Sequence, residues 1–146
     1  MRWYKIYNFP AISLRFFNVY GPRLNTSDGY KSVFGIFLAQ KLSNKPLTIV
    51  GDGNQTRDFI HAKDAAVAML KSALSKKVGK IYNVGFGKET KVNVIAKLFG
   101  GKKKYIPKRY SETNRSLADI KKIKRELNWK PKIKIEQGIK DFLKSY

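Results

Sequence analysis

Apolar residues along the chain fall into short unbroken runs and into stretches with helical spacing. Residues 11–20 form an apolar, aromatic and β-branched run that ends at Gly21-Pro22, which predicts a buried strand followed by a loop. From residue 30 to residue 42 the apolar side chains recur at helical spacing, which predicts an amphipathic helix with Ser27 or Asp28 as its cap. The same reasoning predicts strands at 47–50, 57–61 and 80–84, and helices at 62–74, 92–99, 117–127 and 135–146.

Strands and helices therefore alternate, with about four short strands and five helices, and this alternation predicts an α/β or α+β architecture. Residues 3–7 resemble the end of a helix, whereas a doubly wound domain usually opens on a strand and a Gly-rich turn. No repeat, low-complexity tract or long linker divides the 146 residues, so we expect one domain of ordinary size.

The net charge of +21 arises from 31 Lys and Arg residues against 10 Asp and Glu. Such a charge attracts polyanions non-specifically, which keeps nucleic acid among the candidate partners. The excess is mostly lysine, however, and it is spread along the whole chain, whereas surfaces that read bases or clamp phosphates depend on arginine. The charge pattern therefore disfavours a dedicated nucleic-acid-binding role.

The scarcity of certain residue types excludes several kinds of site. The chain has no cysteine, which excludes disulfides, Cys-ligated zinc and a thiol nucleophile. Its one histidine, His61, leaves no multi-histidine metal site. No apolar stretch approaches the roughly 20 residues that span a bilayer, and the first residues lack the features of a signal peptide. We expect a soluble cytoplasmic protein without a metal or membrane partner.

Taken one at a time, the polar motifs favour structural roles. The two G-x-G turns, at 51–53 and 85–87, lack the third glycine of a dinucleotide-binding turn and are read as tight turns. Asp64 stands where a helix begins and is expected to cap it, while His61 is expected to hydrogen-bond the turn before it. Arg57 beside Asp58 is equally compatible with a local ion pair and with anion binding.

Five motifs in combination are far more specific than any of them alone. They are Arg15 to Arg23 (RFFNVYGPR), Gly51 to Asp64 (GDGNQTRDFIHAKD), Tyr82 to Gly85 (YNVG), Pro107 to Glu112 (PKRYSE) and Leu127 to Pro131 (LNWKP). In this order and spacing they resemble the C-terminal half of the extended short-chain dehydrogenases/reductases. The most similar members are NAD-dependent nucleotide-sugar epimerases and dehydratases of the UDP-glucose 4-epimerase type. The resemblance runs from about Arg2 to the C-terminus.

The resemblance implies a particular α/β fold. We expect the last strands of a Rossmann-type NAD-binding sheet, followed by the small α/β substrate-binding domain of a truncated extended short-chain dehydrogenase. Residues 1–24 and 58–87 would contribute to the sheet. Residues 25–57 and 88–146 would contribute to the substrate-binding domain. Family members are often homodimers.

The resemblance also implies a binding site for a nucleotide-diphosphate sugar, most simply a UDP-sugar. The residue matching Phe17 lies against the nicotinamide of NAD, with plain core packing as the alternative, and the residue matching Asn18 hydrogen-bonds the substrate pyrophosphate. The segment with Thr48 and Val50 lines the nucleotide base with backbone and apolar groups.

Three further residues complete the implied site. The residues matching Arg57 and Arg109 clamp the diphosphate, and the residue matching Glu112 accepts a hydrogen bond from a ribose hydroxyl. Two guanidinium groups facing a diphosphate provide the bidentate, charge-assisted recognition that this group favours. Arg115 is either a third cation of this clamp or a surface residue.

The sequence departs from the family pattern at the catalytic residues. Family members use a Tyr-x-x-x-Lys pair for acid–base chemistry during transient hydride transfer to NAD. No tyrosine here has a lysine four residues later, and the Gly-rich NAD turn is also missing. We therefore expect a fragment of a full-length epimerase that binds substrate but is inactive alone, with NAD held mainly by the missing half. Two alternatives remain open: one half of a two-chain enzyme or nucleotide-sugar-binding module, and a basic nucleic-acid-binding protein.

The sequence does not distinguish epimerase, dehydratase and decarboxylase, nor the sugar. Exposure of strand faces that the missing half would cover predicts poor solubility alone.

Overall fold

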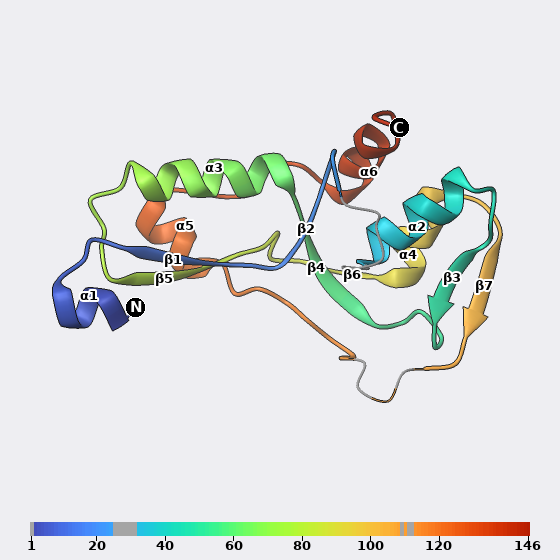
Figure 1. Ribbon diagram of the computed structural model, residues 1–146, viewed down its shortest axis with the longest axis horizontal. Helices are drawn as coiled ribbons and strands as arrows, with labels where there is room; N and C mark the ends of the chain where they lie inside the picture. The colour runs from blue at the N-terminus through green and yellow to red at the C-terminus, as the bar shows by residue number, and fades with distance from the viewer. Residues whose placement is uncertain (1, 25–31, 109, 111–112) are drawn as a thin grey trace.

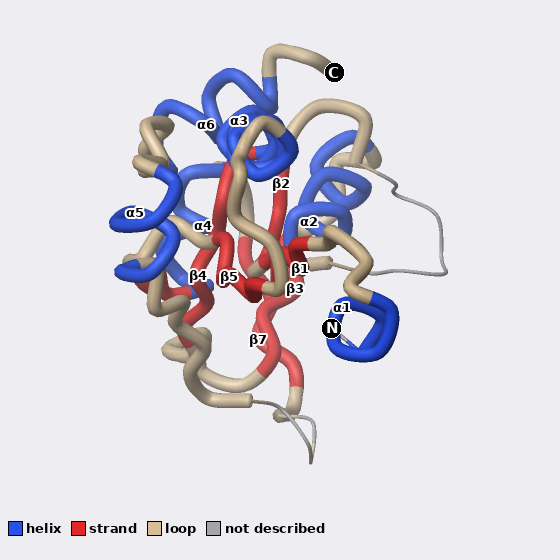
Figure 2. Tube along the Cα trace, turned by 90° about the vertical axis from the view of Figure 1, so that its left-hand side faces the viewer, coloured by secondary structure: helices blue, strands red, loops and turns tan. Residues whose placement is uncertain are grey.

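The computed structural model describes residues 2–24, 32–108, 110 and 113–146. Strands pass through the middle of an elongated molecule, and helices lie on either side of them (Figure 1). Seen from one end, the strands pass through the middle, with α5 (Lys121–Leu127) on one side and α1 (Arg2–Tyr7) and α2 (Val33–Leu42) on the other (Figure 2). The predicted α/β class is confirmed.

The apolar run at 11–20 forms one extended segment that changes its partner halfway along. Its first part, β1 (Ile12–Phe16), pairs in parallel with β5 (Lys80–Val84). Its second part, β2 (Asn18–Tyr20), pairs in parallel with β4 (Thr56–His61). At the junction the Phe17 N–H donates to the Val84 carbonyl across 2.9 Å. The change of partner sends the chain from one sheet into the next at Phe17.

Three further strands take part in the sheets of the described chain. The first half of β4 pairs antiparallel with β6 (Glu89–Lys91). β3 (Leu47–Val50) pairs in parallel with β7 (Lys103–Ile106). The strands predicted at 47–50, 57–61 and 80–84 are confirmed, whereas β6 and the lysine-rich β7 were not predicted. Both are short and polar, and they lack the apolar run that identifies a buried strand.

The helices follow the predictions except at some of their ends. α3 (Ala62–Ala73), α4 (Val92–Phe99) and α6 (Ile135–Leu143) lie where they were expected. The cap of α2 is Ser32, whose Oγ accepts from the Gly35 N–H at 3.2 Å, so the expectation of a cap at Ser27 or Asp28 is wrong. Both of those residues lie outside the described part of the chain. α5 begins at Lys121 rather than at 117, because the Ala118 N–H bonds to a distant carboxylate.

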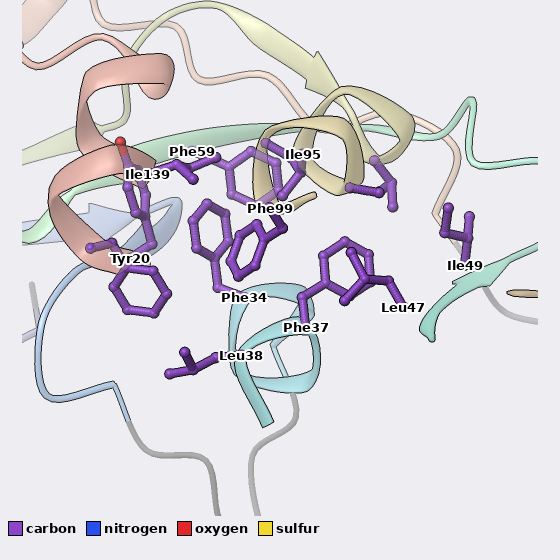
Figure 3. Packing of buried hydrophobic residues seen from close by; sticks show 13 residues of the cluster. Tyr20, Phe34, Phe37, Leu38, Leu47, Ile49, Phe59, Ile95, Phe99 and Ile139 are labelled. Atoms are coloured by element: carbon purple, nitrogen blue, oxygen red, sulfur yellow. The ribbon is translucent and has the colours of Figure 1, made fainter. Parts of the chain in front are cut away.

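Buried side chains form two separate clusters. The first is mainly aromatic and lies among α2, α4, α6 and the ends of β2 and β4, with Phe34 packed against Tyr20, Phe59, Phe99 and Phe142 (Figure 3). The second lies under α3 and α5 and contains Ile60, Tyr82, Val84 and Trp129. β4 serves both clusters, because its consecutive residues Phe59 and Ile60 point to opposite faces. The domain limits implied by the family resemblance stay a prediction.

Candidate functional site

A pocket of about 690 Å³ opens where β2 begins, between α2, β3 and the first half of β4. Five of the seven predicted binding residues line it: Phe17, Asn18, Thr48, Val50 and Arg57. They come from three segments of the chain, so the fold brings together residues up to forty positions apart. The other two, Arg109 and Glu112, lie outside the described residues. The binding roles of all seven stay predictions.

Phe17 and Asn18 stand where the extended segment changes sheet. Phe17 is half-buried: it packs against the second core cluster and also lines the pocket, and its place against the nicotinamide stays a prediction. Asn18 is exposed, and its Nδ2 donates to the Asp58 carbonyl across 2.9 Å. This bond orients the Asn18 side chain, a neutral amide, at the pocket rim.

Thr48 and Val50 occupy alternate positions on β3, so their peptide groups face the same edge of the strand. The Thr48 N–H donates to Gln40 Oε1 at 2.9 Å, and Gln40 Nε2 donates to the Thr48 hydroxyl at 2.7 Å. The Val50 carbonyl accepts from Gln55 Nε2 at 3.0 Å. Two side-chain amides therefore hold the pocket edge of β3.

Arg57 lies on the pocket face of β4, with its Nη1 donating to the Thr56 carbonyl at 2.9 Å. Asp58 points the other way and is fully buried, so a local ion pair between these neighbours is not formed. The Asp58 carboxylate instead accepts three backbone N–H groups, from Phe86 at 2.6 Å, Gly87 at 2.9 Å and Ala118 at 3.1 Å. Burial raises the pKa of Asp58 above its usual value. The three hydrogen bonds lower the pKa, but burial has the larger effect.

The Asp58 carboxylate explains the second glycine turn. A side chain on Gly85 would overlap the Asp58 carboxylate and the Ala118 side chain, and Gly87 has a left-handed φ of 77°. The other turn is fixed against α4, since the Asn93 N–H donates to the Gly53 carbonyl and Asn93 Nδ2 to the Asp52 carbonyl. Both glycine turns are tight turns committed to internal contacts, as predicted.

The start of α3 differs from the sequence prediction in the residue that caps it. His61 Nδ1 accepts from the Lys63 N–H at 3.1 Å, so the cap of α3 is His61 and not Asp64. The buried Asp64 carboxylate accepts hydrogen bonds from the Lys132 and Ile133 N–H groups at 2.9 Å each. The backbone carbonyl of Asp64 accepts a further bond from Trp129 Nε1. Burial lowers the pKa of His61 below its usual value of 6.5, and the nearby Asp64 opposes that shift.

The sequence analysis did not predict several polar residues of the site. Ser32, Gln55 and Ser116 line the pocket, and Gln40 supports it from α2. Gln55 belongs to the motif at 51–64, which was the available signal, whereas nothing in the sequence pattern marks Gln40. Arg115 is a surface residue paired with Glu89 at 2.6 Å.

Other kinds of site find no support in the described part of the chain. No three His, Cys, Asp or Glu residues gather there in a way that could hold a metal ion. No helix described is both long and apolar enough to cross a membrane.

Comparison with known proteins decides the family. The sequence profile of the NAD dependent epimerase/dehydratase family matches residues 2–85. The chain belongs to this family. Over 142 residues it is 41% identical to a Methanocaldococcus jannaschii protein provisionally named UDP-glucose 4-epimerase, covering 93% of this chain and 45% of that protein.

Solved structures of family members agree in fold. The Thermotoga maritima UDP-glucose 4-epimerase with UDP-glucose superimposes with a TM-score of 0.90 at 31% identity, over 99% of this chain and 48% of that one. The Bacillus cereus UDP-glucuronic acid 4-epimerase, in complex with UDP-glucuronic acid and NAD, gives 0.88 at 28% identity, over 99% and 47%. The chain thus spans about half the length of these relatives.

Proposed function

We propose that this chain is the nucleotide-sugar-binding portion of an NAD-dependent epimerase/dehydratase, and that its pocket binds a UDP-sugar. One observation carries the proposal: Asn18, Thr48, Val50 and Arg57, chosen from the sequence for this role, line a single pocket together with Phe17. A volume of about 690 Å³ lies within the usual range for small-molecule sites.

Each part of such a ligand has a chemically suitable partner at the pocket. Arg57 supplies a guanidinium for the diphosphate, the group that charge-assisted, bidentate bonds recognise best. Asn18 adds a neutral amide at the rim, and the edge of β3 offers peptide groups to a planar base. Arg109 and Glu112 are proposed to add a second cation and a ribose acceptor.

The chain's own residues do not fit a complete NAD site. Phe17 offers an apolar wall, but both glycine turns are used for internal contacts with α4 and Asp58. No Tyr-x-x-x-Lys pair occurs in the sequence either. We infer that NAD is held mainly by residues outside this sequence and that turnover depends on a tyrosine–lysine pair from the same source.

Calorimetric titration with UDP-glucose tests the proposal. We expect saturable binding to one site and a loss of about tenfold or more in affinity for Arg57→Ala, because charged hydrogen bonds contribute about 1.5–3 kcal/mol each. Arg125→Ala is the matched control, since Arg125 is an exposed cation on α5 whose partner there is Glu126.

The same titration with arbitrary DNA tests the alternative of a basic nucleic-acid-binding protein. Binding to such a partner falls steeply with added salt. If UDP-glucose does not bind, while DNA binds and both arginine variants weaken that binding equally, the nucleotide-sugar function is wrong.

A further inference from the structure

One edge of β3 pairs with β7, and no strand of the described chain pairs with the other edge. Leu47 N–H donates to the Lys102 carbonyl and Gly51 N–H to the Ile106 carbonyl, both at 2.8 Å, so the odd-numbered residues face β7. Strand alternation turns the peptide groups of Thr48 and Val50 to the opposite edge. Both residues line the pocket. That edge carries four polar groups, two N–H donors and two carbonyl acceptors.

Two glutamines occupy the outer pair of these four groups. Gln40, from α2, takes the Thr48 N–H, and Gln55, from the turn before β4, takes the Val50 carbonyl. Within the described chain, the inner pair, the Thr48 carbonyl and the Val50 N–H, has no hydrogen-bond partner. The pocket edge of β3 therefore offers one acceptor followed by one donor.

We propose that Gln40 and Gln55 are positioning residues that determine which base the pocket accepts. By occupying the outer groups, they leave an acceptor–donor pair that matches a ring N–H beside a ring carbonyl, as in the N3–H and O4 of uracil. This inference rests on the proposed function, because it assumes that the base of the nucleotide lies along β3.

The selectivity follows from the cost of unpaired polar groups. A ligand that covers the Thr48 carbonyl without donating to it leaves a desolvated acceptor, which lowers the affinity for that ligand. If either glutamine is lost, the edge gains another open group that water or a shifted ligand can use. The base is then held in more than one register and the requirement for its N–H weakens.

UDP and its N3-methyluracil analogue are the probes, because methylation removes the one donor that the Thr48 carbonyl would accept. We expect the unchanged chain to bind UDP at least about fivefold more tightly than the analogue, as one hydrogen bond and its desolvation imply. The readout is this ratio of affinities. A general loosening of the fold would weaken both ligands alike and leave the ratio unchanged.

One substitution made at both glutamines gives a charge-matched pair of variants. In Gln40→Glu a carboxylate still accepts the Thr48 N–H, and the Thr48 hydroxyl donates to it, so the ratio should be kept. In Gln55→Glu the side chain can no longer donate to the Val50 carbonyl, so the ratio should fall to about twofold or less. Gln40→Ala should lower it to the same extent.

The outcomes separate this inference from the proposed function. If the unchanged chain does not bind UDP, both are wrong. If it binds UDP but does not discriminate against the analogue, or if the two Gln→Glu variants behave alike, the pocket remains a nucleotide site. The glutamine inference is then overturned.

Discussion

Arg57 and Asp58 are neighbours in sequence, yet they face opposite sides of β4. Arg57 lines the pocket, while the buried carboxylate of Asp58 accepts the N–H groups of Phe86, Gly87 and Ala118 behind it. Asp58 thereby ties β4 to the turn after β5 and to the segment that leads from Ser116 to α5. The strand that carries Arg57, the residue proposed to bind the diphosphate, is therefore fixed from its opposite face.

Replacing Asp58 by Asn should therefore destabilise the fold. An Asn side chain has one acceptor oxygen, and its amide would face a backbone N–H, leaving buried donors unpaired. We expect the free energy of unfolding in urea to fall by about 2–4 kcal/mol. Asp141→Asn is the control, because Asp141 is exposed and its hydrogen bond, from Gln137, lies within the same helix, so stability should change little. Equal effects of the two substitutions would contradict the role assigned to Asp58.

The stability of the chain should decrease in mild acid through His61. Burial lowers the pKa of His61 in the folded state, so the unfolded chain takes up this proton first as the pH falls below 6.5. Protonation of Nδ1 also removes the acceptor for the Lys63 N–H that begins α3. Urea midpoints at pH 7.5 and 5.5 measure the loss. His61→Asn, a neutral cap, should lose less stability over this range, since the chain has no other histidine. The same loss in both proteins would exclude His61 as its source.

Tyr20 and Gly138 form a contact that reverses the usual effect of a helical glycine. A side chain on Gly138 would overlap the Tyr20 hydroxyl, and no described residue bonds that buried hydroxyl. We expect Gly138→Ala to lower the free energy of unfolding by about 1–3 kcal/mol, although alanine ordinarily favours a helix. Tyr20→Phe should leave stability unchanged or raise it by up to about 1 kcal/mol, and it should recover part of the alanine cost in the double variant. Strictly additive effects would contradict this contact.

Exposed aromatic residues at one end of the molecule should promote self-association. Trp3, Tyr7 and Phe9 are 68%, 66% and 56% exposed, next to β1, whose described partner is β5 alone. Sedimentation velocity should show concentration-dependent association that decreases when these three residues are replaced by serine. Leu42→Ser, at the end of α2, is the matched control and should change nothing. A monodisperse monomer with a sharp thermal transition would contradict the prediction.

Local pattern predicted most elements because their apolar spacing is strong, as in the run at 11–20. It did not predict that this run breaks at Phe17, since the break follows from a change of partner between β5 and β4. β6 and β7 were missed for a similar reason: their residues are polar and become strands only by pairing with β4 and β3. Long-range pairing leaves no local signal in a single sequence.

The binding residues were predicted from motifs, and the structure gathers the described ones around one pocket. Residues that act through others were harder to recognise. Asp58 was read as a possible partner of Arg57 because the two are adjacent in sequence, although consecutive residues of the strand predicted there face opposite sides. Gln40 belongs to no motif, and only its two bonds to Thr48 mark it.

Mapping the backbone amide signals of the ¹⁵N-labelled chain during titration with UDP-glucose is the decisive test of the nucleotide-sugar pocket, because it locates the ligand. We expect saturable shifts at Asn18, Val50, Arg57 and Ser116, unchanged by moderate salt, with α5 unaffected. Shifts concentrated on the lysines of α5 that disappear as salt is added would show a non-specific polyanion surface and contradict the nucleotide-sugar pocket.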